Sequence, residues 1–117
     1  MTTLYGIKNC DTIRKARRWL ADNDIEYRFH DVRADGITRK DLQQWMKSLE
    51  WDKLLNRRGT TWRNLPAELR DTITKARATD VMLENPAIIK RPVLEHGGRL
   101  YLGFSKDSYQ SIFETVT

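Results

Sequence analysis

The chain has one cysteine, Cys10, and the polar residues on both sides of it indicate an exposed turn that opens a helix. A helix N-terminus carries roughly +0.5 of an elementary charge, and unpaired backbone N–H groups point outward from it. A thiolate is stabilised there, and the pKa of a cysteine can fall from about 8.5 to between roughly 3.5 and 7.5 in such surroundings. We therefore predict that Cys10 is a nucleophile.

Basic residues near Cys10 strengthen this prediction. Arg14 lies one helical turn further on the same face, because side chains four residues apart are neighbours on a helix. Lys8 and Lys15 add positive charge, whereas Asp11 removes some. The alternative interpretation is structural, because a free cysteine is often buried and then behaves as a small hydrophobic residue. The two interpretations differ in whether the thiol is accessible.

The overall composition limits the possible partners. The net charge of +5 over 117 residues favours anions in general, but no nucleic-acid-binding motif accompanies the scattered basic residues, so nucleic acid is not expected. One cysteine permits no internal disulfide, and with His30 and His96 it has no metal-ligand spacing, so we expect no metal site. No signal-peptide-like or membrane-spanning apolar stretch is present in the sequence. We therefore expect a cytoplasmic protein that does not bind membranes.

The N-terminal part of the chain is predicted to form a β-α-β unit. Residues 2–5 are expected to form a short strand that ends at Gly6. Residues 10–23 have helical periodicity, and residues 26–32 are expected to form a second strand. The helical connection predicts that the two strands are parallel neighbours.

The middle of the chain is predicted to be mostly helical. Thr38 is expected to cap a helix through a capping box with Asp41, and the apolar residues that follow recur at helical spacing. A basic loop is expected over residues 56–61. A helix that begins with a proline is expected over residues 66–75, and a shorter one over residues 80–84.

The C-terminal part is predicted to form a hairpin and a helix. Residues 87–96 and 99–102 are expected to pair as antiparallel strands, because the two glycines between them are typical of a tight turn. Ser105 is expected to cap the last helix. The apolar face of that helix carries, at helical spacing, Tyr109, Ile112, Phe113 and Val116.

This order of elements, with a cysteine after the first strand, resembles the thioredoxin fold. The predicted fold class is therefore α/β, with a β-α-β unit, a helical insertion, a β-β-α unit and a mixed sheet. We expect one thioredoxin-like domain over residues 1–117, with the mostly helical insertion at about residues 37–85.

Three stretches resemble the arsenate reductase (ArsC)/Spx family more specifically, and their order and spacing extend over nearly the whole chain. They are Tyr5-Gly6-Ile7-Lys8-Asn9-Cys10-Asp11-Thr12 with Arg14-Lys15-Ala16, Leu54-Leu55-Asn56-Arg57-Arg58-Gly59, and Leu83-Glu84-Asn85-Pro86 with Ile88-Ile89-Lys90-Arg91-Pro92-Val93. The form Gly-Ile-Lys-Asn-Cys-Asp-Thr in the first stretch resembles the YffB-like branch. Members of that branch are proposed to be glutathione-dependent thiol reductases.

The resemblance implies that Cys10 is the nucleophile and that Arg91-Pro92 is the arginine–cis-proline step that faces it. In thioredoxin-like folds, the residue before this proline offers its backbone to an extended peptide or to glutathione. The guanidinium of Arg91 could also hold a carboxylate or oxyanion with two hydrogen bonds. From the residues alone, Arg91-Pro92 could instead be an ordinary start of a strand. The side chains expected to bind substrate or glutathione are Lys8, Asn9, Arg14, Arg58, Arg91 and Pro92.

The sequence also departs from the family pattern. Arsenate reductases of the family use three arginines around the thiol. Asn56 stands at the first of these positions, next to Arg57 and Arg58, and the latter matches the arginine of the Spx-like pattern. Phe104-Ser105 replaces the Arg-Pro that carries the third. Each lost charged hydrogen bond to an oxyanion is worth roughly 1.5–3 kcal/mol, so we do not expect efficient arsenate reduction.

The leading hypothesis is a monothiol oxidoreductase in which Cys10 attacks a disulfide or another electrophilic sulfur or oxyanion. No cofactor is expected to be tightly bound, and glutathione is expected as the co-substrate that resolves the mixed intermediate. Expected partners are glutathione or another small anionic substrate, and also a protein disulfide. The alternative is an Spx-like regulator that binds a protein such as RNA polymerase. Ile13 stands where Spx proteins commonly have the second cysteine of a Cys-x-x-Cys switch, which argues against a redox-switched regulator.

Overall fold

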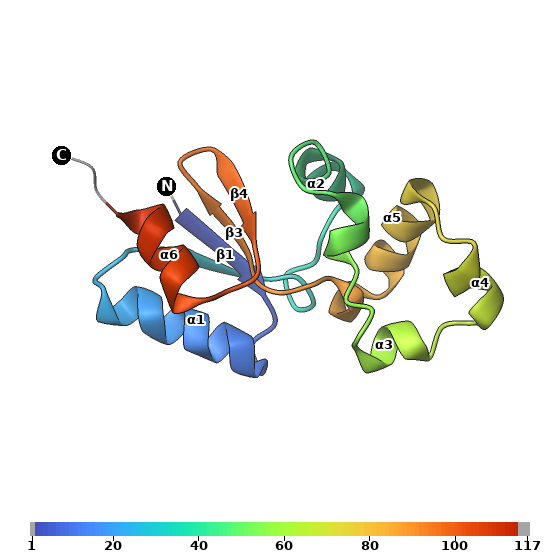
Figure 1. The fold of residues 1–117 in the computed structure, drawn as a ribbon, viewed down its shortest axis with the longest axis horizontal. Coiled ribbons are helices and arrows are strands. Elements are labelled where there is room, and N and C mark those ends of the chain that lie inside the picture. The colour runs from blue at the N-terminus through green and yellow to red at the C-terminus, as the bar shows by residue number, and fades with distance from the viewer. Residues whose placement is uncertain (1, 115–117) are drawn as a thin grey trace.

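The computed structural model describes residues 2–114, which contain a four-stranded mixed sheet in the order β2-β1-β3-β4 (Figure 1). The strands are β1 (Thr2–Gly6), β2 (Arg28–Asp31), β3 (Val93–His96) and β4 (Arg99–Leu102). Strand β1 is parallel to β2 and antiparallel to β3, and β3 and β4 form an antiparallel hairpin. The predicted α/β fold with its mixed sheet, its parallel first pair and its C-terminal hairpin is confirmed.

Helices connect and follow the strands of this sheet, and they form most of the middle of the chain. They are α1 (Asp11–Asp22), α2 (Arg39–Trp45), α3 (Thr60–Arg63), α4 (Ala67–Asp71), α5 (Lys75–Glu84) and α6 (Lys106–Phe113), with the 3-10 helices η1 (Trp51–Leu54) and η2 (Pro86–Ile88). Within residues 2–114, no helix has both the length and the apolar character needed to cross a bilayer.

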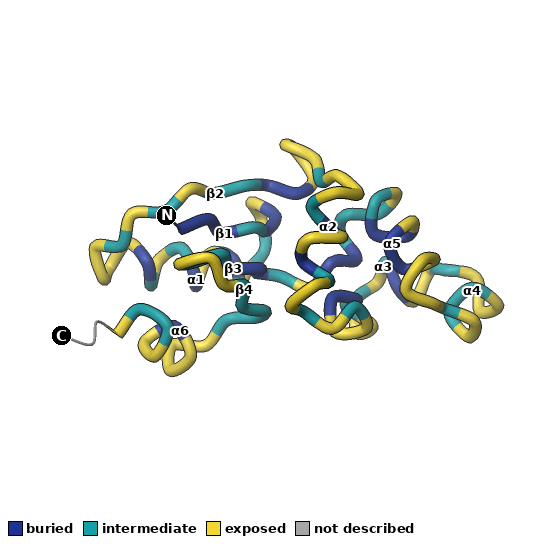
Figure 2. The backbone as a smooth tube through the Cα atoms, turned by 90° about the horizontal axis from the view of Figure 1, so that it is seen from above, coloured by how far each residue is buried: buried dark blue, intermediate teal, exposed yellow. Residues whose placement is uncertain are grey.

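Helices α1 and α6 lie against one face of the sheet (Figures 1 and 2). Leu4 and Leu94, from the paired strands β1 and β3, point to this face and pack with Leu20 of α1 and Tyr109 of α6. All four residues are fully buried. Burial of a leucine side chain contributes about 1.5–3 kcal/mol, so this cluster is a main source of stability for the sheet and its two helices.

A second core joins the sheet to the helical insertion, which comprises α2 to α5 and extends the molecule to 50 × 27 × 25 Å (Figure 1). Tyr5 and Val93 belong to this core, because alternate residues of a strand face opposite sides of the sheet. The ring of Tyr5 packs edge-on against Trp45 of α2, with 4.9 Å between the ring centroids. The insertion is therefore packed onto the sheet and is not a detached appendage.

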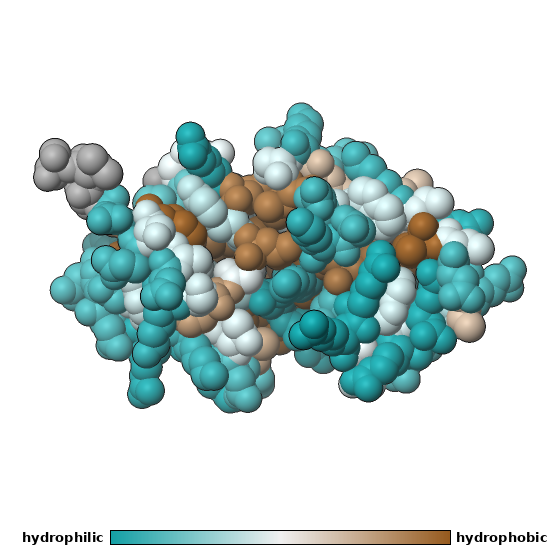
Figure 3. Space-filling model, in the orientation of Figure 1, coloured by the Kyte–Doolittle hydropathy of each residue, from teal (hydrophilic) through white to brown (hydrophobic). Residues whose placement is uncertain are grey.

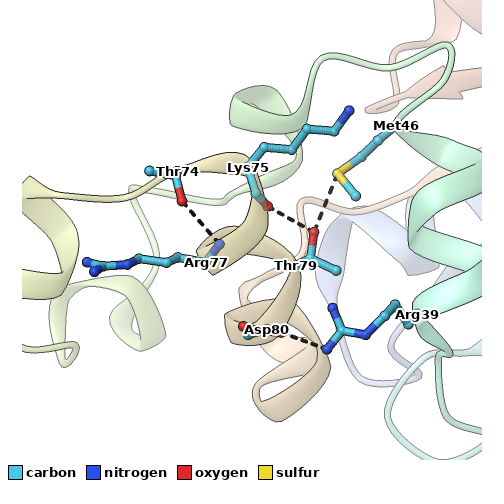
Figure 4. Close-up of polar contacts among 7 residues, drawn as sticks. All are labelled: Arg39, Met46, Thr74, Lys75, Arg77, Thr79 and Asp80. Atoms are coloured by element: carbon cyan, nitrogen blue, oxygen red, sulfur yellow. Dashed lines mark hydrogen bonds and ion pairs between the residues drawn. The ribbon is translucent and has the colours of Figure 1, made fainter.

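Polar contacts add to the packing of α2 against α5 (Figure 4). The guanidinium of Arg39 pairs with the carboxylate of Asp80 at 2.6 Å. The hydroxyl of Thr79 lies 2.9 Å from the carbonyl oxygen of Lys75 and 3.8 Å from the sulfur of Met46. An exposed ion pair contributes no more than about 1 kcal/mol, so the buried apolar residues of this pair of helices matter more.

The helix predicted over residues 66–75 is wrong at its C-terminal end, because α4 stops at Asp71. Helix α5 begins directly after Thr74, whose hydroxyl accepts a hydrogen bond from the backbone N–H of Arg77 at 3.3 Å (Figure 4). The short helix predicted over residues 80–84 is only the second half of α5. A threonine can lie inside a helix or cap one, and here capping by Thr74 places the boundary between the two helices earlier than predicted.

The strand predicted over residues 87–96 begins only at Val93. Its first part instead forms the end of η2 and a single bridge between Ile89 and Leu55. The proline before β3 has no N–H to donate to a ladder, which favours this late start. The basic loop predicted over residues 56–61 is also shorter, because α3 begins inside it.

The two helix caps predicted from the sequence are confirmed. Thr38 caps α2 through a capping box with Asp41, and Ser105 caps α6 through a similar exchange with Ser108. Each satisfies backbone N–H groups that a helix otherwise leaves unpaired. Val116, which was predicted on the apolar face of the last helix, lies outside the described residues.

Gly6, at the end of β1, lets α1 lie directly against the strand. A Cβ atom at this position would overlap the side chain of Ile13, which is fully buried and has little room to move. The carbonyl of Gly6 also accepts a hydrogen bond from the backbone N–H of Val32 at 2.9 Å. Gly6 therefore sets the spacing between β1 and the helix that follows Cys10.

We expect Gly6→Ala to lower the free energy of unfolding by about 1–3 kcal/mol, the usual cost of overpacking a core. Urea denaturation would measure the change. Gln110→Ala, at an exposed position of α6, is the control and should stay within about 0.5 kcal/mol of the wild type. Wild-type stability in Gly6→Ala would mean that α1 can move away from the strand without loss.

Candidate active site

Cys10 is the N-cap residue of α1, at the end of the loop that leaves β1. Its backbone is extended and its side chain is partly exposed. The thiol is therefore accessible, and the interpretation of Cys10 as a fully buried hydrophobic residue does not apply.

The surroundings of Cys10 favour its thiolate. Burial raises the pKa of the Cys10 thiol, but the backbone N–H of Ile13, the guanidinium of Arg91 and the backbone N–H of Thr12 together lower it more. The pKa therefore lies below its ordinary value. The two N–H groups belong to the first turn of α1, where they have no partner within the helix. More of the thiol is ionised at neutral pH than in a free cysteine.

Arg91 is the charged residue that acts on the Cys10 thiol, and its guanidinium helps to lower the pKa of that thiol. Its Nη1 donates to the carbonyl oxygen of Ala87 at 2.7 Å, which fixes the orientation of the guanidinium. Its Nε is buried and has no partner among the described residues. The peptide bond between Arg91 and Pro92 is cis, as expected from the resemblance, and Pro92 is buried.

The other residues predicted near the thiol are placed differently. Arg14 donates to the carboxylate of Asp11 at 2.9 Å, and its side chain is 60% exposed. Lys8 and Asn9 are exposed on the loop before Cys10. The charge of Arg14 is therefore directed to its neighbour on the helix.

Arg57 and Arg58 lie on the loop between η1 and α3, in the helical insertion. The guanidinium of Arg57 stacks over the ring of Trp62, 5.2 Å from its centroid. The backbone carbonyl of Arg58 accepts a hydrogen bond from the side chain of Arg63 at 3.1 Å. Both arginines are exposed and line a cleft together with Lys90, the residue before Arg91.

Asp31, which the sequence analysis did not single out, holds the loop that leads to Cys10. Its buried carboxylate accepts hydrogen bonds from the backbone N–H groups of Lys8 at 3.2 Å, Arg33 at 2.8 Å and Ala34 at 2.9 Å. Burial raises the pKa of the Asp31 carboxyl, but these three hydrogen bonds lower it more. The available signal is an aspartate at the end of a strand, which often forms a local turn of this kind.

The described residues, 2–114, contain no group of three or more His, Cys, Asp and Glu side chains that could hold a metal ion. The two histidines make structural contacts instead. Nε2 of His30 lies 2.7 Å from the carbonyl oxygen of Gly36, and Nδ1 of His96 lies 2.8 Å from the hydroxyl of Thr2. The chemistry that this site offers is that of a thiolate beside a guanidinium.

The chain is similar to known proteins over nearly its whole length. Residues 5–112 match the model of the ArsC family. An uncharacterized protein of Haemophilus influenzae is 46% identical over 113 residues, which are 97% of this chain and 99% of that protein. The solved structure of the YFFB (PA3664) protein is 46% identical with a TM-score of 0.90, over 95% of this chain and 97% of that one. The global transcriptional regulator Spx of Listeria innocua is 27% identical, over 92% of this chain and 82% of that protein.

Replacing Arg91 by alanine should raise the pKa of the Cys10 thiol, because the change removes a guanidinium whose positive charge favours the thiolate. The rate of alkylation by iodoacetamide, measured against pH, reports this pKa. Arg14→Ala is the matched control, since its guanidinium already pairs with Asp11. A larger shift in Arg14→Ala than in Arg91→Ala would contradict the assignment.

Asp31 should make stability depend on pH. Because its pKa is lower in the folded state, its contribution is complete above the unfolded value of about 3.9 and is lost as the pH falls through the folded pKa. We expect Asp31→Asn to be less stable at pH 7 by about 1.5–3 kcal/mol, the range for one hydrogen bond to a charged group.

Urea denaturation at neutral and acidic pH would test this expectation. The wild type should lose more stability on acidification than Asp31→Asn, because only the wild type has the ionised carboxylate to lose. Glu26→Gln, which changes an exposed carboxylate, is the control and should follow the wild type. Parallel losses in the wild type and in Asp31→Asn would show that the Asp31 carboxylate does not cause the pH dependence.

Proposed function

The chain belongs to the ArsC family, and from this premise we propose that it is a monothiol thiol–disulfide oxidoreductase with Cys10 as its nucleophile. One observation carries this proposal. Cys10 is accessible at the N-terminus of α1 and lies beside Arg91, and its thiol pKa is lowered. Accessible cysteines in electropositive surroundings are the reactive ones, whereas buried cysteines in apolar surroundings are inert.

The proposed reaction is a series of three thiol–disulfide exchanges. The thiolate of Cys10 attacks one sulfur of a disulfide, the S–S bond breaks, and the other sulfur leaves as a thiolate that takes a proton from solvent. A glutathione thiolate then attacks the mixed disulfide and releases Cys10. A second glutathione thiolate attacks the resulting disulfide between glutathione and the substrate, which yields oxidised glutathione and frees the remaining substrate thiol. The resolving thiol is external because the sequence has no other cysteine.

The residues around Cys10 have distinct proposed roles. The N–H groups of the first turn of α1 and the guanidinium of Arg91 stabilise the thiolate as nucleophile and as leaving group. Arg91 is held by the carbonyl of Ala87, so it meets an anionic substrate in a fixed orientation. The residues proposed to form the site for the substrate or glutathione are Lys8, Asn9, Arg14, Arg58, Arg91 and Pro92. A reaction that uses glutathione suits the reducing cytoplasm, where we propose that the protein acts.

Arsenate is proposed to be a poor substrate. Phe104 stands at the position of the third arginine of the family's arsenate reductases. The ring of Phe104 packs edge-on against the buried Tyr109, with 4.7 Å between the centroids. This position therefore supports the core of the sheet and offers no positive charge to an oxyanion, which leaves fewer charged donors for arsenate.

The similarity to Spx supports a second candidate, a regulator that binds a protein partner such as RNA polymerase. Capture of proteins from a cytosolic extract by the wild type and by Cys10→Ser separates the two functions. An oxidoreductase should trap mixed disulfides in the wild type only. A regulator should retain the same partner in both forms without a covalent bond.

A direct test of the oxidoreductase uses oxidised glutathione and the pure protein at neutral pH. Mass spectrometry should show the addition of one glutathionyl group to the wild type and its removal by fresh reduced glutathione. Cys10→Ser should gain no mass. Absence of the adduct from the wild type, with the thiol still open to iodoacetamide, would refute a glutathione-coupled reaction at Cys10.

A further inference from the structure

A basic cleft of about 540 Å³ lies where the helical insertion meets the sheet. This volume falls within the range of roughly 300–1,000 Å³ that is usual for ligand sites. Basic and apolar side chains line the cleft together with one amide, and these residues are Lys53, Arg57, Arg58, Lys90, Leu55, Leu102 and Asn56. Among the described residues that line it, none is acidic.

Backbone hydrogen bonds join the three segments that form the basic cleft. The N–H of Lys90 donates to the carbonyl of Leu54 at 2.7 Å, which ties the segment before β3 to the insertion. The N–H of Gly103 donates to the carbonyl of Pro92 at 2.9 Å, which holds Leu102 of β4 beside the same segment. The cleft is therefore a built feature of the fold and not a chance meeting of flexible side chains.

The basic cleft adjoins the reactive thiol through one residue. Lys90 lines the cleft, and the guanidinium of Arg91, the next residue, favours the thiolate of Cys10. Consecutive Cα atoms are about 3.8 Å apart, so a polypeptide bound across this segment can reach both places. Its disulfide would lie at Cys10 while residues a few positions away lie over the cleft.

The charge of the basic cleft is only partly compensated. Lys53 pairs with Glu50 at 3.1 Å, and Arg57 stacks on an indole ring, a contact that leaves its charge available. Arg58 and Lys90 are exposed and form no ion pair with another described residue. Like charges this close repel one another, and an anion in the cleft would relieve that repulsion.

The apolar residues that line the basic cleft favour a peptide over a small inorganic anion. Of the two leucines that line the cleft, Leu55 is buried and Leu102 is partly exposed. Figure 3 shows hydrophobic side chains over β4 and hydrophilic side chains between β4 and α3. A small inorganic anion would contact only the basic side chains of the cleft. A peptide with acidic and apolar side chains would contact its basic and its apolar residues.

We propose that the basic cleft binds acidic residues of a polypeptide next to the disulfide that Cys10 attacks. This inference rests on the proposed function and names its substrate class, which is a protein disulfide flanked by aspartate or glutamate. The chemical step is the exchange already described, in which the thiolate of Cys10 displaces one sulfur of the disulfide. The cleft supplies attraction and alignment, which act mainly on the rate of productive encounter.

Two disulfide-containing peptides test the proposal. Both peptides contain the same disulfide and one leucine, which can contact the apolar residues of the cleft. In one peptide aspartate and glutamate flank the disulfide, and in the other lysine residues flank it. Mass spectrometry follows the rate at which each forms a mixed disulfide with the reduced protein. At low salt the acidic peptide should react at least about tenfold faster, because steering by charge raises encounter rates roughly 10- to 1,000-fold. The difference should shrink in 1 M salt, where charges are screened beyond about 3 Å.

A charge reversal assigns the effect to the cleft. Lys90→Glu should reduce the preference for the acidic peptide several-fold. Lys40→Glu makes the same change at an exposed position of α2 outside the cleft and should keep the preference. Alkylation of Cys10 by iodoacetamide, a neutral reagent, shows whether each variant retains a reactive thiol.

The outcomes separate this inference from the proposed function. Equal rates for the two peptides, or the same loss in Lys40→Glu as in Lys90→Glu, would overturn the basic cleft as a substrate site and leave the chemistry of Cys10 intact. If neither peptide forms a mixed disulfide with the wild type while iodoacetamide still reacts, the proposed function fails and the inference fails with it.

Discussion

The contact between Cys10 and Arg91 is the interaction on which the rest of the site depends, and the pairing of β1 with β3 creates it. In that antiparallel pair, Tyr5 lies opposite Val93. The residues that follow β1 and those that precede β3 therefore meet at the same end of the sheet. A thiol from the start of the chain and a guanidinium from near its end come together there, where the N-terminus of α1 adds its N–H groups.

The half-buried position of the thiol involves two opposing effects. Partial burial raises the pKa of Cys10, but it also strengthens each hydrogen bond and charge that acts on the sulfur. The segment that follows the insertion also affects the thiol, because the carbonyl of Ala87 in η2 orients the guanidinium of Arg91. Asp31 contributes from another direction by holding the loop before the thiol. The proposed active site thus depends on several segments that meet at one end of the sheet and not on a single motif.

Local signals predicted many elements of this fold. The caps at Thr38 and Ser105 and the two-glycine hairpin depend on neighbouring residues, so they can be read from the sequence. The break at Thr74 was missed because a threonine is compatible with both a helix interior and a cap. The segment before β3 is extended, but it forms only a single bridge, to Leu55 of the insertion. Because Leu55 is remote in sequence, local pattern could not distinguish this bridge from a strand.

By itself, the sequence determined the lone thiol at a helix N-terminus, the external origin of any resolving thiol and the mixed sheet, since these follow from composition and local pattern. The family resemblance implied that Arg91 faces the thiol, and the tertiary structure decided between Arg91 and Arg14. Spacing along a helix favoured Arg14, but Asp11 engages that side chain locally, and Arg91 arrives from a distant segment. The role of Asp31 and the basic cleft also emerged only in three dimensions, because strand register and packing determine which remote residues become neighbours.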